Sequence, residues 1–127
     1  GADVALANRT EERAHELAAD VTGASGHGLD ELPSLMAEAD VVANATSVGL
    51  ESDESVAPAD AWHSDLTAFD AVYKPLETRF LKDAQDAGAQ TIGGAWMLLF
   101  QGVEAFEMWT GVDAPVETMN EALREHL

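Results

Sequence analysis

The sequence predicts an α/β fold in which helices cover a parallel β-sheet. Short apolar segments alternate along the chain with longer segments whose apolar residues recur at helical spacing. The clearest strand lies in "DVVANATSVG" at residues 40–49, where a short apolar run is followed abruptly by amide, hydroxyl and glycine residues. A strand that is apolar on both faces suits a parallel sheet covered by helices. We therefore expect right-handed crossovers and a ligand just beyond the carboxyl ends of the strands.

The N-terminal part of the chain predicts a strand, two helices and a loop. Residues 4–7 form an apolar strand that ends at "NRT", and Thr10 is a suitable N-cap for the helix that follows. Apolar residues at 14, 17, 18 and 21 then repeat at helical spacing. The glycines within 23–28 predict a loop with room for a short strand, and residues 30–39 predict a second helix.

The C-terminal part predicts two more strands and three more helices. Residues 51–65 are acidic and contain Ser and Pro, so we expect a solvated connector with Trp62 as an anchor. The remaining elements are a strand at 68–73, a helix at 78–87 closed by Gly88, a short strand at 89–92, a long apolar helix at 95–110 stopped by Gly111, and an amphipathic helix that begins near Pro115.

Charge is the strongest signal in the composition. The 127 residues include 24 acidic and 6 basic side chains, which give a formal net charge of −18. Such self-repulsion destabilises a folded chain in dilute salt, and molar salt screens it because the Debye length falls to about 3 Å. We interpret the chain as a protein of a salt-loaded cytoplasm; an acidic protein of an ordinary cytoplasm is the alternative. Without a basic face, nucleic-acid binding is disfavoured, and no apolar run could span a bilayer.

The stretch "NRTEER" at residues 8–13 is the first candidate site. Arg9 and Arg13 are two of only four arginines, and they lie where a strand gives way to a helix. At the end of the second strand of a dinucleotide-binding sheet, an acidic residue accepts from a ribose 2′-hydroxyl, whereas an arginine accommodates a 2′-phosphate. The alternative is a capped helix whose arginines pair with Glu11 and Glu12.

Three further stretches carry polar residues where a ligand could lie. Residues 44–49, "NATSVG", follow a strand, although local satisfaction of backbone groups is the simpler interpretation. Tyr73 lies where a strand ends, with a half-buried core tyrosine as the alternative, and Lys74 before Pro75 is interpreted as solvated. Gln101 has an amide suited to recognising hydroxyl groups, or faces water. The scattered histidines and the absence of cysteine predict no metal site.

Five segments together resemble the cofactor-binding half of the shikimate dehydrogenase family. In chain order they are "NRTEERA", "DVVANATSVG", "DAVYKPLETRFL", "GAQTIGGAWMLLFQG" and "AFEMWTG". The resemblance implies a Rossmann-like NADP domain joined to a separate substrate domain. It also implies the family's reaction, the reversible NADP-dependent reduction of 3-dehydroshikimate to shikimate in aromatic amino acid biosynthesis.

The resemblance implies cofactor roles for eight residues and substrate roles for two. The cofactor contacts are to the adenosine 2′-phosphate, to the nicotinamide ribose and, through the backbone, to the nicotinamide. The matching residues are, in that order, Asn8, Arg9, Thr10 and Arg13; Thr46 and Ser47; and Ala71 and Gly94. The side chains that match contacts to the substrate are Tyr73 and Gln101.

Two parts of the family pattern have no counterpart in this sequence. The family's catalytic lysine and aspartate belong to the substrate domain, and Lys74 does not replace them. The first Rossmann strand and its glycine-rich turn, which feeds a pyrophosphate-binding helix, are also absent. In the order 3-2-1-4-5-6 that strand lies between those at 4–7 and 41–45. We expect two exposed edges, filled within a longer chain or by a partner, and helices at 95–127 that pack toward the missing domain.

Two hypotheses follow. The first is that residues 1–127 are the truncated NADP-binding domain of a shikimate dehydrogenase from a salt-adapted organism, without activity by themselves. The second is a non-catalytic nucleotide-binding or interaction module on the same scaffold. Tyr73 and Gln101 favour the enzyme, because a pure cofactor binder needs neither side chain.

Overall fold

A computed structural model describes residues 1–127, and strands alternate with helices along the chain. The strands are β1 (Val4–Asn8), β2 (Ala24–Gly28), β3 (Val41–Asn44), β4 (Thr67–Asp70) and β5 (Gln90–Ile92). The helices are α1 (Glu11–Ala19), α2 (Leu32–Glu38), α3 (Arg79–Asp86), α4 (Gly94–Thr110) and α5 (Val116–His126), with 3-10 turns at Leu29–Glu31 and Ala59–Ala61. The predicted elements are confirmed, apart from their bounds and the segment 23–28.

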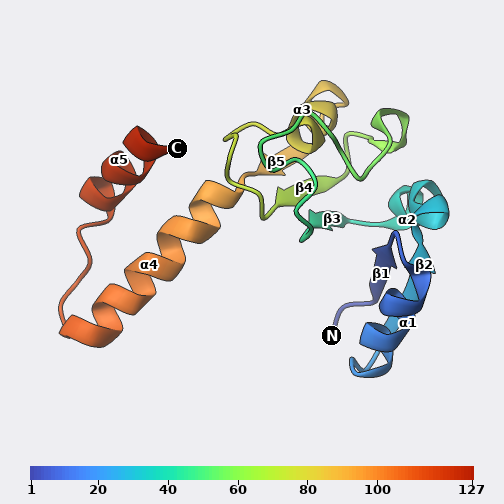
Figure 1. The fold of residues 1–127 in the computed structure, drawn as a ribbon, viewed down its shortest axis with the longest axis horizontal. Helices are drawn as coiled ribbons and strands as arrows, with labels where there is room; N and C mark the ends of the chain where they lie inside the picture. Colours follow the sequence, from blue (N-terminus) through green and yellow to red (C-terminus); the bar gives the residue numbers. More distant parts are fainter.

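All strand pairings are parallel, and the sheet is divided into two pieces. β1 pairs with β2, while β3, β4 and β5 form the second piece in that order. β1 and β3 do not pair, so each keeps one free edge, and the two pieces lie next to each other (Figure 1). This arrangement is what the order 3-2-1-4-5-6 leaves when strand one is removed. The predicted Rossmann-like sheet, incomplete at its first strand, is confirmed.

The segment 23–28 was predicted as a loop with room for a short strand, and in the structure the strand β2 occupies most of it. β2 consists of "ASGHG", which lacks the β-branched and aromatic residues that usually mark a strand. Its small residues allow α1 to pack closely: a Cβ at Gly26 would lie 2.5 Å from the backbone nitrogen of His15. The close approach of the helix therefore requires glycine in this strand. Because glycine is uncommon in strands, the sequence pattern does not indicate one here.

The helix ends lie within about two residues of the predicted ones, but one predicted cap makes no side-chain capping bond. Thr10 precedes α1 and makes no side-chain capping bond. Its backbone N–H instead donates to Oδ1 of Asn8, at 2.8 Å. At α3, Thr78 Oγ1 accepts a hydrogen bond from the N–H of Leu81, at 3.3 Å. Gly88, with φ of +84°, follows this helix in the left-handed conformation predicted for it.

The main hydrophobic core lies between the β3-β4-β5 piece and helices α2 and α3. Met36, Leu66, Ala68 and Phe80 are each at most 1% exposed. The ring of Trp62 packs edge-on against that of Phe80, with centroids 4.9 Å apart. The acidic connector is therefore anchored to the core by Trp62, as predicted.

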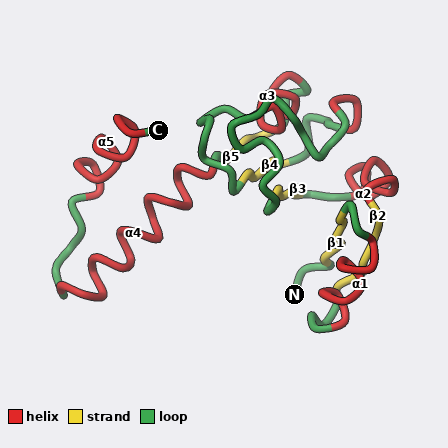
Figure 2. The backbone as a smooth tube through the Cα atoms, in the orientation of Figure 1, coloured by secondary structure: helices red, strands yellow, loops and turns green.

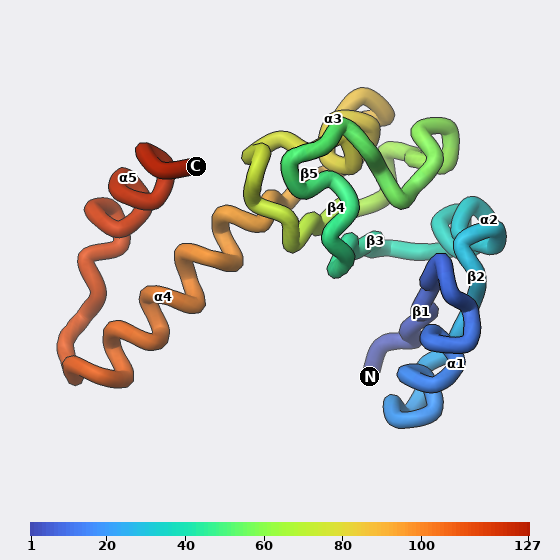
Figure 3. The backbone as a smooth tube through the Cα atoms, in the orientation of Figure 1, coloured from blue at the N-terminus to red at the C-terminus, as the bar shows by residue number.

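Helices α4 and α5 extend away from the sheet and pack against each other, as Figures 1 and 2 show. Figure 3 shows the N-terminus leading into β1 and the C-terminus at the end of α5, so the chain ends belong to different parts of the molecule. On α4, Trp96 and Phe100 are 44% and 50% exposed, and Met108 and Trp109 are 80% and 81% exposed. The expected uncovered apolar surface is thus present. None of the helices has the length and hydropathy that crossing a bilayer requires.

Candidate functional site

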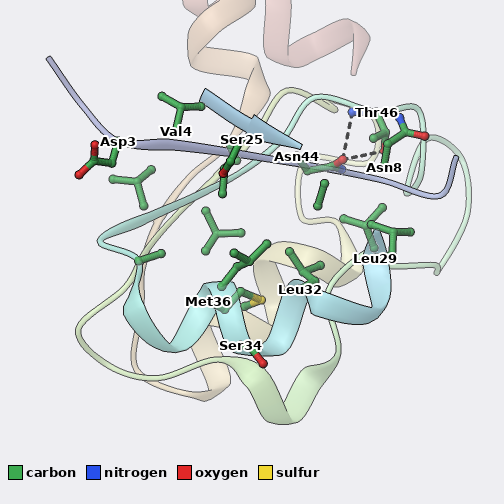
Figure 4. A pocket seen from close by; sticks show the side chains of 18 of the residues that line it. Asp3, Val4, Asn8, Ser25, Leu29, Leu32, Ser34, Met36, Asn44 and Thr46 are labelled. Carbon is green, nitrogen blue, oxygen red and sulfur yellow. Dashed lines mark hydrogen bonds between the residues drawn. The ribbon is translucent and has the colours of Figure 1, made fainter. Parts of the chain in front are cut away.

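A groove of about 1210 Å³ separates the two pieces of the sheet. Val4 and Ala7 of β1 line one side, Val42 of β3 lines the other, and Met36 of α2 contributes to the lining. Figure 4 shows Val4 across the groove from Leu32 and Met36 of α2. The groove lies where the resemblance predicted an absent strand, and about half of its lining residues are hydrophobic.

Polar residues gather at one end of the groove, where β1 and β3 end. Figure 4 shows Asn8 beside Asn44 and Thr46 at this end, with Asp3 at the other. The groove-lining residues that the sequence predicted as cofactor contacts are Asn8, Arg9, Thr10, Arg13, Thr46 and Ser47. The fold thus brings together six residues from two stretches that lie more than thirty positions apart.

Arg9 and Arg13 are exposed cations without a carboxylate partner. The alternative, in which they pair with Glu11 and Glu12, is not what the structure shows. Glu11 instead contacts His15, with 3.1 Å between Oε1 and Nε2. In a chain with 24 acidic residues, this leaves two guanidinium groups at the carboxyl end of the groove with their donors free for an anion.

The amide of Asn44 has every hydrogen-bonding position occupied. Its Oδ1 accepts from the Thr46 hydroxyl at 2.7 Å and from the Thr46 N–H at 3.1 Å. Its Nδ2 donates to the Val48 carbonyl and to Oδ1 of Asp70, both at 3.0 Å. The simpler interpretation of "NATSVG", in which the polar side chains form hydrogen bonds with nearby protein groups, therefore holds for Asn44 and the Thr46 hydroxyl. Ser47 is exposed and makes no such bond.

Asp70 and Thr78 bound a stretch that the sequence singled out, but neither was assigned a role from the sequence. Asp70 is fully buried, and its Oδ2 accepts a hydrogen bond from the Thr78 hydroxyl at 2.5 Å. Its Oδ1 accepts from the N–H of Val72 at 3.0 Å as well as from Asn44. The signal that could have revealed their contact is the register of the strand pairing. Asp70 ends β4 directly opposite Asn44, which ends β3.

The backbone at Ala71 lies unusually close to Gly94, at the start of α4. A Cβ at Gly94 would lie 2.5 Å from the Ala71 carbonyl oxygen and 2.7 Å from that of Val72. The structure therefore brings together these two residues, which the sequence predicted as backbone contacts to a nicotinamide. Neither lines the groove itself.

Tyr73 and Gln101, the two predicted substrate contacts, lie outside the groove. Tyr73 is three residues beyond the end of β4, rather than at the end as expected, and is 38% exposed. Gln101 is exposed on α4, and its Nε2 donates to the Leu98 carbonyl at 2.9 Å. Lys74, which was interpreted as solvated, is half-exposed and lies near Glu51, with 3.6 Å between Nζ and Oε1.

Arg79 differs from Arg9 and Arg13 because it is held by carboxylates. Its Nε donates to Oδ1 of Asp83 at 2.7 Å, and this hydrogen bond, with the nearby charges of Asp83 and Asp53, raises the pKa of Arg79. Unlike Arg9 and Arg13, Arg79 therefore has its charge paired within the chain. The structure contains no group of three or more His, Asp or Glu side chains that could hold a metal ion.

Two family models match the chain at its two ends. The model described as shikimate / quinate 5-dehydrogenase matches residues 1–58. The model described as the shikimate 5′-dehydrogenase C-terminal domain matches residues 94–124. Both matches include residues of the candidate site.

Individual relatives match the whole chain. A shikimate dehydrogenase (NADP(+)) from Haloarcula marismortui is 63% identical over 127 residues, which are 100% of this chain and 48% of that enzyme. Shikimate 5-dehydrogenase from Thermus thermophilus, solved with NADP(H) and shikimate, has a TM-score of 0.85 and 38% identity over 100% of this chain and 47% of its own. Quinate dehydrogenase from Corynebacterium glutamicum, solved with NAD, has a TM-score of 0.85 and 29% identity over 97% of this chain and 46% of its own. The chain spans about half the length of these relatives.

Proposed function

The chain belongs to the shikimate dehydrogenase family, and we propose that it is the NADP-binding part of an enzyme that reversibly reduces 3-dehydroshikimate to shikimate. This reaction is a step of aromatic amino acid biosynthesis. The activity belongs to a longer protein, since the chain spans about half the length of the relatives that it matches. The same consideration supports a further domain, or a partner, that completes the sheet between β1 and β3.

The observation that carries the proposal is the pair of unpartnered arginines at the carboxyl end of the groove. Arg9 and Arg13 are exposed, form no ion pair and line the groove beside Asn8 and Thr10. A guanidinium group binds a phosphate through parallel charged hydrogen bonds. NADP differs from NAD by its 2′-phosphate, so these two cations favour NADP.

The other predicted residues have roles at the reacting end of the cofactor. NADPH, when bound, supplies the hydride that adds to the carbonyl carbon of the substrate. Backbone at Ala71 and Gly94 lies beside the nicotinamide, Thr46 and Ser47 lie along its ribose, and Tyr73 and Gln101 contact the substrate. No residue of this chain matches the catalytic lysine and aspartate of the family, so residues 1–127 alone are expected to show no turnover.

The cofactor proposal is tested in the intact enzyme by the substitution Arg9→Asp. Loss of a charged contact to the phosphate costs about 1.5–3 kcal/mol, so we expect the Kd for NADP+ to rise about 10- to 100-fold. The Kd for NAD+, which carries no 2′-phosphate, should change far less. Fluorescence titration of both cofactors measures the difference.

Lys82→Asp is the matched control, because it makes the same change in net charge at an exposed residue of α3 that does not line the groove. It should leave both dissociation constants near those of the wild type. Equal weakening of NADP+ and NAD+ by Arg9→Asp would remove the 2′-phosphate assignment. Dehydrogenase activity of residues 1–127 alone would contradict the assignment of the proton-transfer residues to another domain.

A further inference from the structure

We infer that Asp70 is a positioning residue for the hydride transfer, acting through its hydrogen bonds to Asn44 and Thr78. This inference rests on the proposed function. Asp70, Asn44 and Thr78 are referred to below as the Asp70 network. None of the three was predicted to touch cofactor or substrate, and the network acts by fixing the backbone that does.

Burial shows that the Asp70 network is part of the interior rather than a group of solvated loop residues. Asp70 and Thr78 are 0% exposed and Asn44 is 1% exposed. Burial of such polar groups is costly unless their hydrogen bonds are made. Every polar side-chain atom of the three has a partner in the structure. An ionised carboxylate is an acceptor only, and the three groups around Asp70 are all donors.

The Asp70 network connects two loops that leave the sheet at the same edge, after β3 and after β4, with the start of α3. Asn44 holds the loop after β3 through Thr46 and the Val48 carbonyl. Asp70 holds the loop after β4 through the N–H of Val72. Thr78 attaches the start of α3 to that loop, because its hydroxyl donates to Asp70 while its oxygen accepts from the N–H of Leu81. A shift of any one segment breaks a buried bond to another.

The same segments carry the residues assigned to the reacting end of the cofactor. Ala71 follows Asp70 directly, its N–H donates to the Asn44 carbonyl at 2.9 Å, and its own carbonyl abuts Gly94. Tyr73 lies two residues further along the loop. The position of the nicotinamide relative to the substrate therefore depends on the Asp70 network.

The arginines lie outside this arrangement. Arg9 and Arg13 follow β1, in the other piece of the sheet, and no hydrogen bond joins them to the Asp70 network. Damage to the network should therefore affect turnover and substrate use while leaving the preference for NADP+ over NAD+ intact. A role in stability alone would produce no such separation.

The test uses the intact enzyme with the substitutions Thr78→Val and Thr78→Ser. Valine matches threonine in shape but cannot donate to Asp70, whereas serine keeps the hydroxyl. A misplacement of about 1 Å at a reacting centre can cost about 100-fold in rate. We expect Thr78→Val to lower kcat by about 10- to 100-fold and to raise KM for shikimate. The ratio of Kd values for NADP+ and NAD+ should stay within about twofold of the wild type, since the arginines are untouched. Thr78→Ser, which keeps the hydroxyl, should have a kcat much closer to that of the wild type than Thr78→Val has.

A second variant separates this effect from the loss of the α3 cap. Asp70→Asn leaves the Thr78 hydroxyl in place at the helix start but replaces one acceptor oxygen by a donor amide. It should lower kcat as Thr78→Val does, and it provides the test if Thr78→Val does not fold. Folded variants with wild-type kcat and KM, and only a lower melting midpoint, would overturn the inference. Failure of the wild-type enzyme to oxidise shikimate with NADP+ would instead overturn the proposed function.

Discussion

Gly94 has no Cβ, and this allows α4 to approach the loop after β4 closely. The carbonyl oxygens of Ala71 and Val72 occupy the space in which any larger side chain would begin. Both are backbone atoms, so they cannot move aside as a flexible side chain could. At the residue scale, the junction of helix and loop therefore depends on glycine for its lack of a Cβ rather than for an unusual backbone angle.

Gly94→Ala should destabilise the intact protein. Overpacking against rigid backbone typically costs about 1–3 kcal/mol, and the displaced loop carries Ala71 and Tyr73. We expect a lower midpoint in chemical denaturation together with a reduced kcat. Urea titration at constant salt measures the first effect.

Gly102→Ala in the same helix is the control. Its new Cβ would meet only the terminal methyl of Met119, at 3.5 Å, which is an ordinary contact. Replacing glycine by alanine in a helix interior stabilises by about 0.5–1 kcal/mol, so this variant should have an equal or higher midpoint. A Gly94→Ala protein as stable as Gly102→Ala would show that α4 does not approach the loop so closely.

At the scale of elements, the strands of this sheet differ in how many neighbours they have. β4 pairs on both sides, with β3 and β5, whereas β1 and β3 each pair on one side only. Unpaired strand edges expose backbone groups to water and to other chains. The groove between β1 and β3 is thus a region of low local stability within residues 1–127.

Hydrogen exchange tests this difference between strands. In the 127-residue chain, amides of β1 and β3 should exchange faster than those of β4. In the intact protein, protection of β1 and β3 should rise toward that of β4, because a strand in the groove would pair with both edges. Mass spectrometry of peptides from both proteins measures the change. Equal protection of β1 and β3 in the two proteins would mean that nothing fills the groove.

At the scale of the whole molecule, the dominant feature is a net charge of −18 on 127 residues. Most carboxylates lie on the surface and have no cationic partner, since there are only six basic residues and Arg9 and Arg13 are unpaired. Repulsion among these charges opposes the compact state.

The melting midpoint of the intact protein should therefore rise as KCl increases from about 0.1 M to 2 M, as the Debye length falls from about 10 Å to less than 3 Å. Differential scanning calorimetry at each salt concentration measures the midpoint. Sucrose at matched osmolality is the control, because it does not screen charge. A midpoint that responds to sucrose and KCl alike would assign the effect to solvent exclusion rather than to screening.

The sequence by itself determined the features that depend on neighbouring residues. Helical spacing of apolar residues predicted α1 and α5, and Gly88 and Gly111 marked the ends of α3 and α4, where the backbone takes a positive φ. The arginines of "NRTEER" were found because a strand followed by a capped helix is itself a local pattern. The alternation of strands and helices along the chain also predicted the parallel sheet, whereas its gap was predicted from the resemblance to the shikimate dehydrogenase family.

Only the tertiary structure decided the features that depend on residues far apart in the chain. Asn44 and Asp70 are 26 positions apart, and their hydrogen bond exists because β3 and β4 pair in a register that places them opposite each other. β2 is a strand because it pairs in parallel with β1, although its own residues favour a loop. Local patterns describe the conformation of a segment, whereas burial and pairing are set by the segments that pack around it.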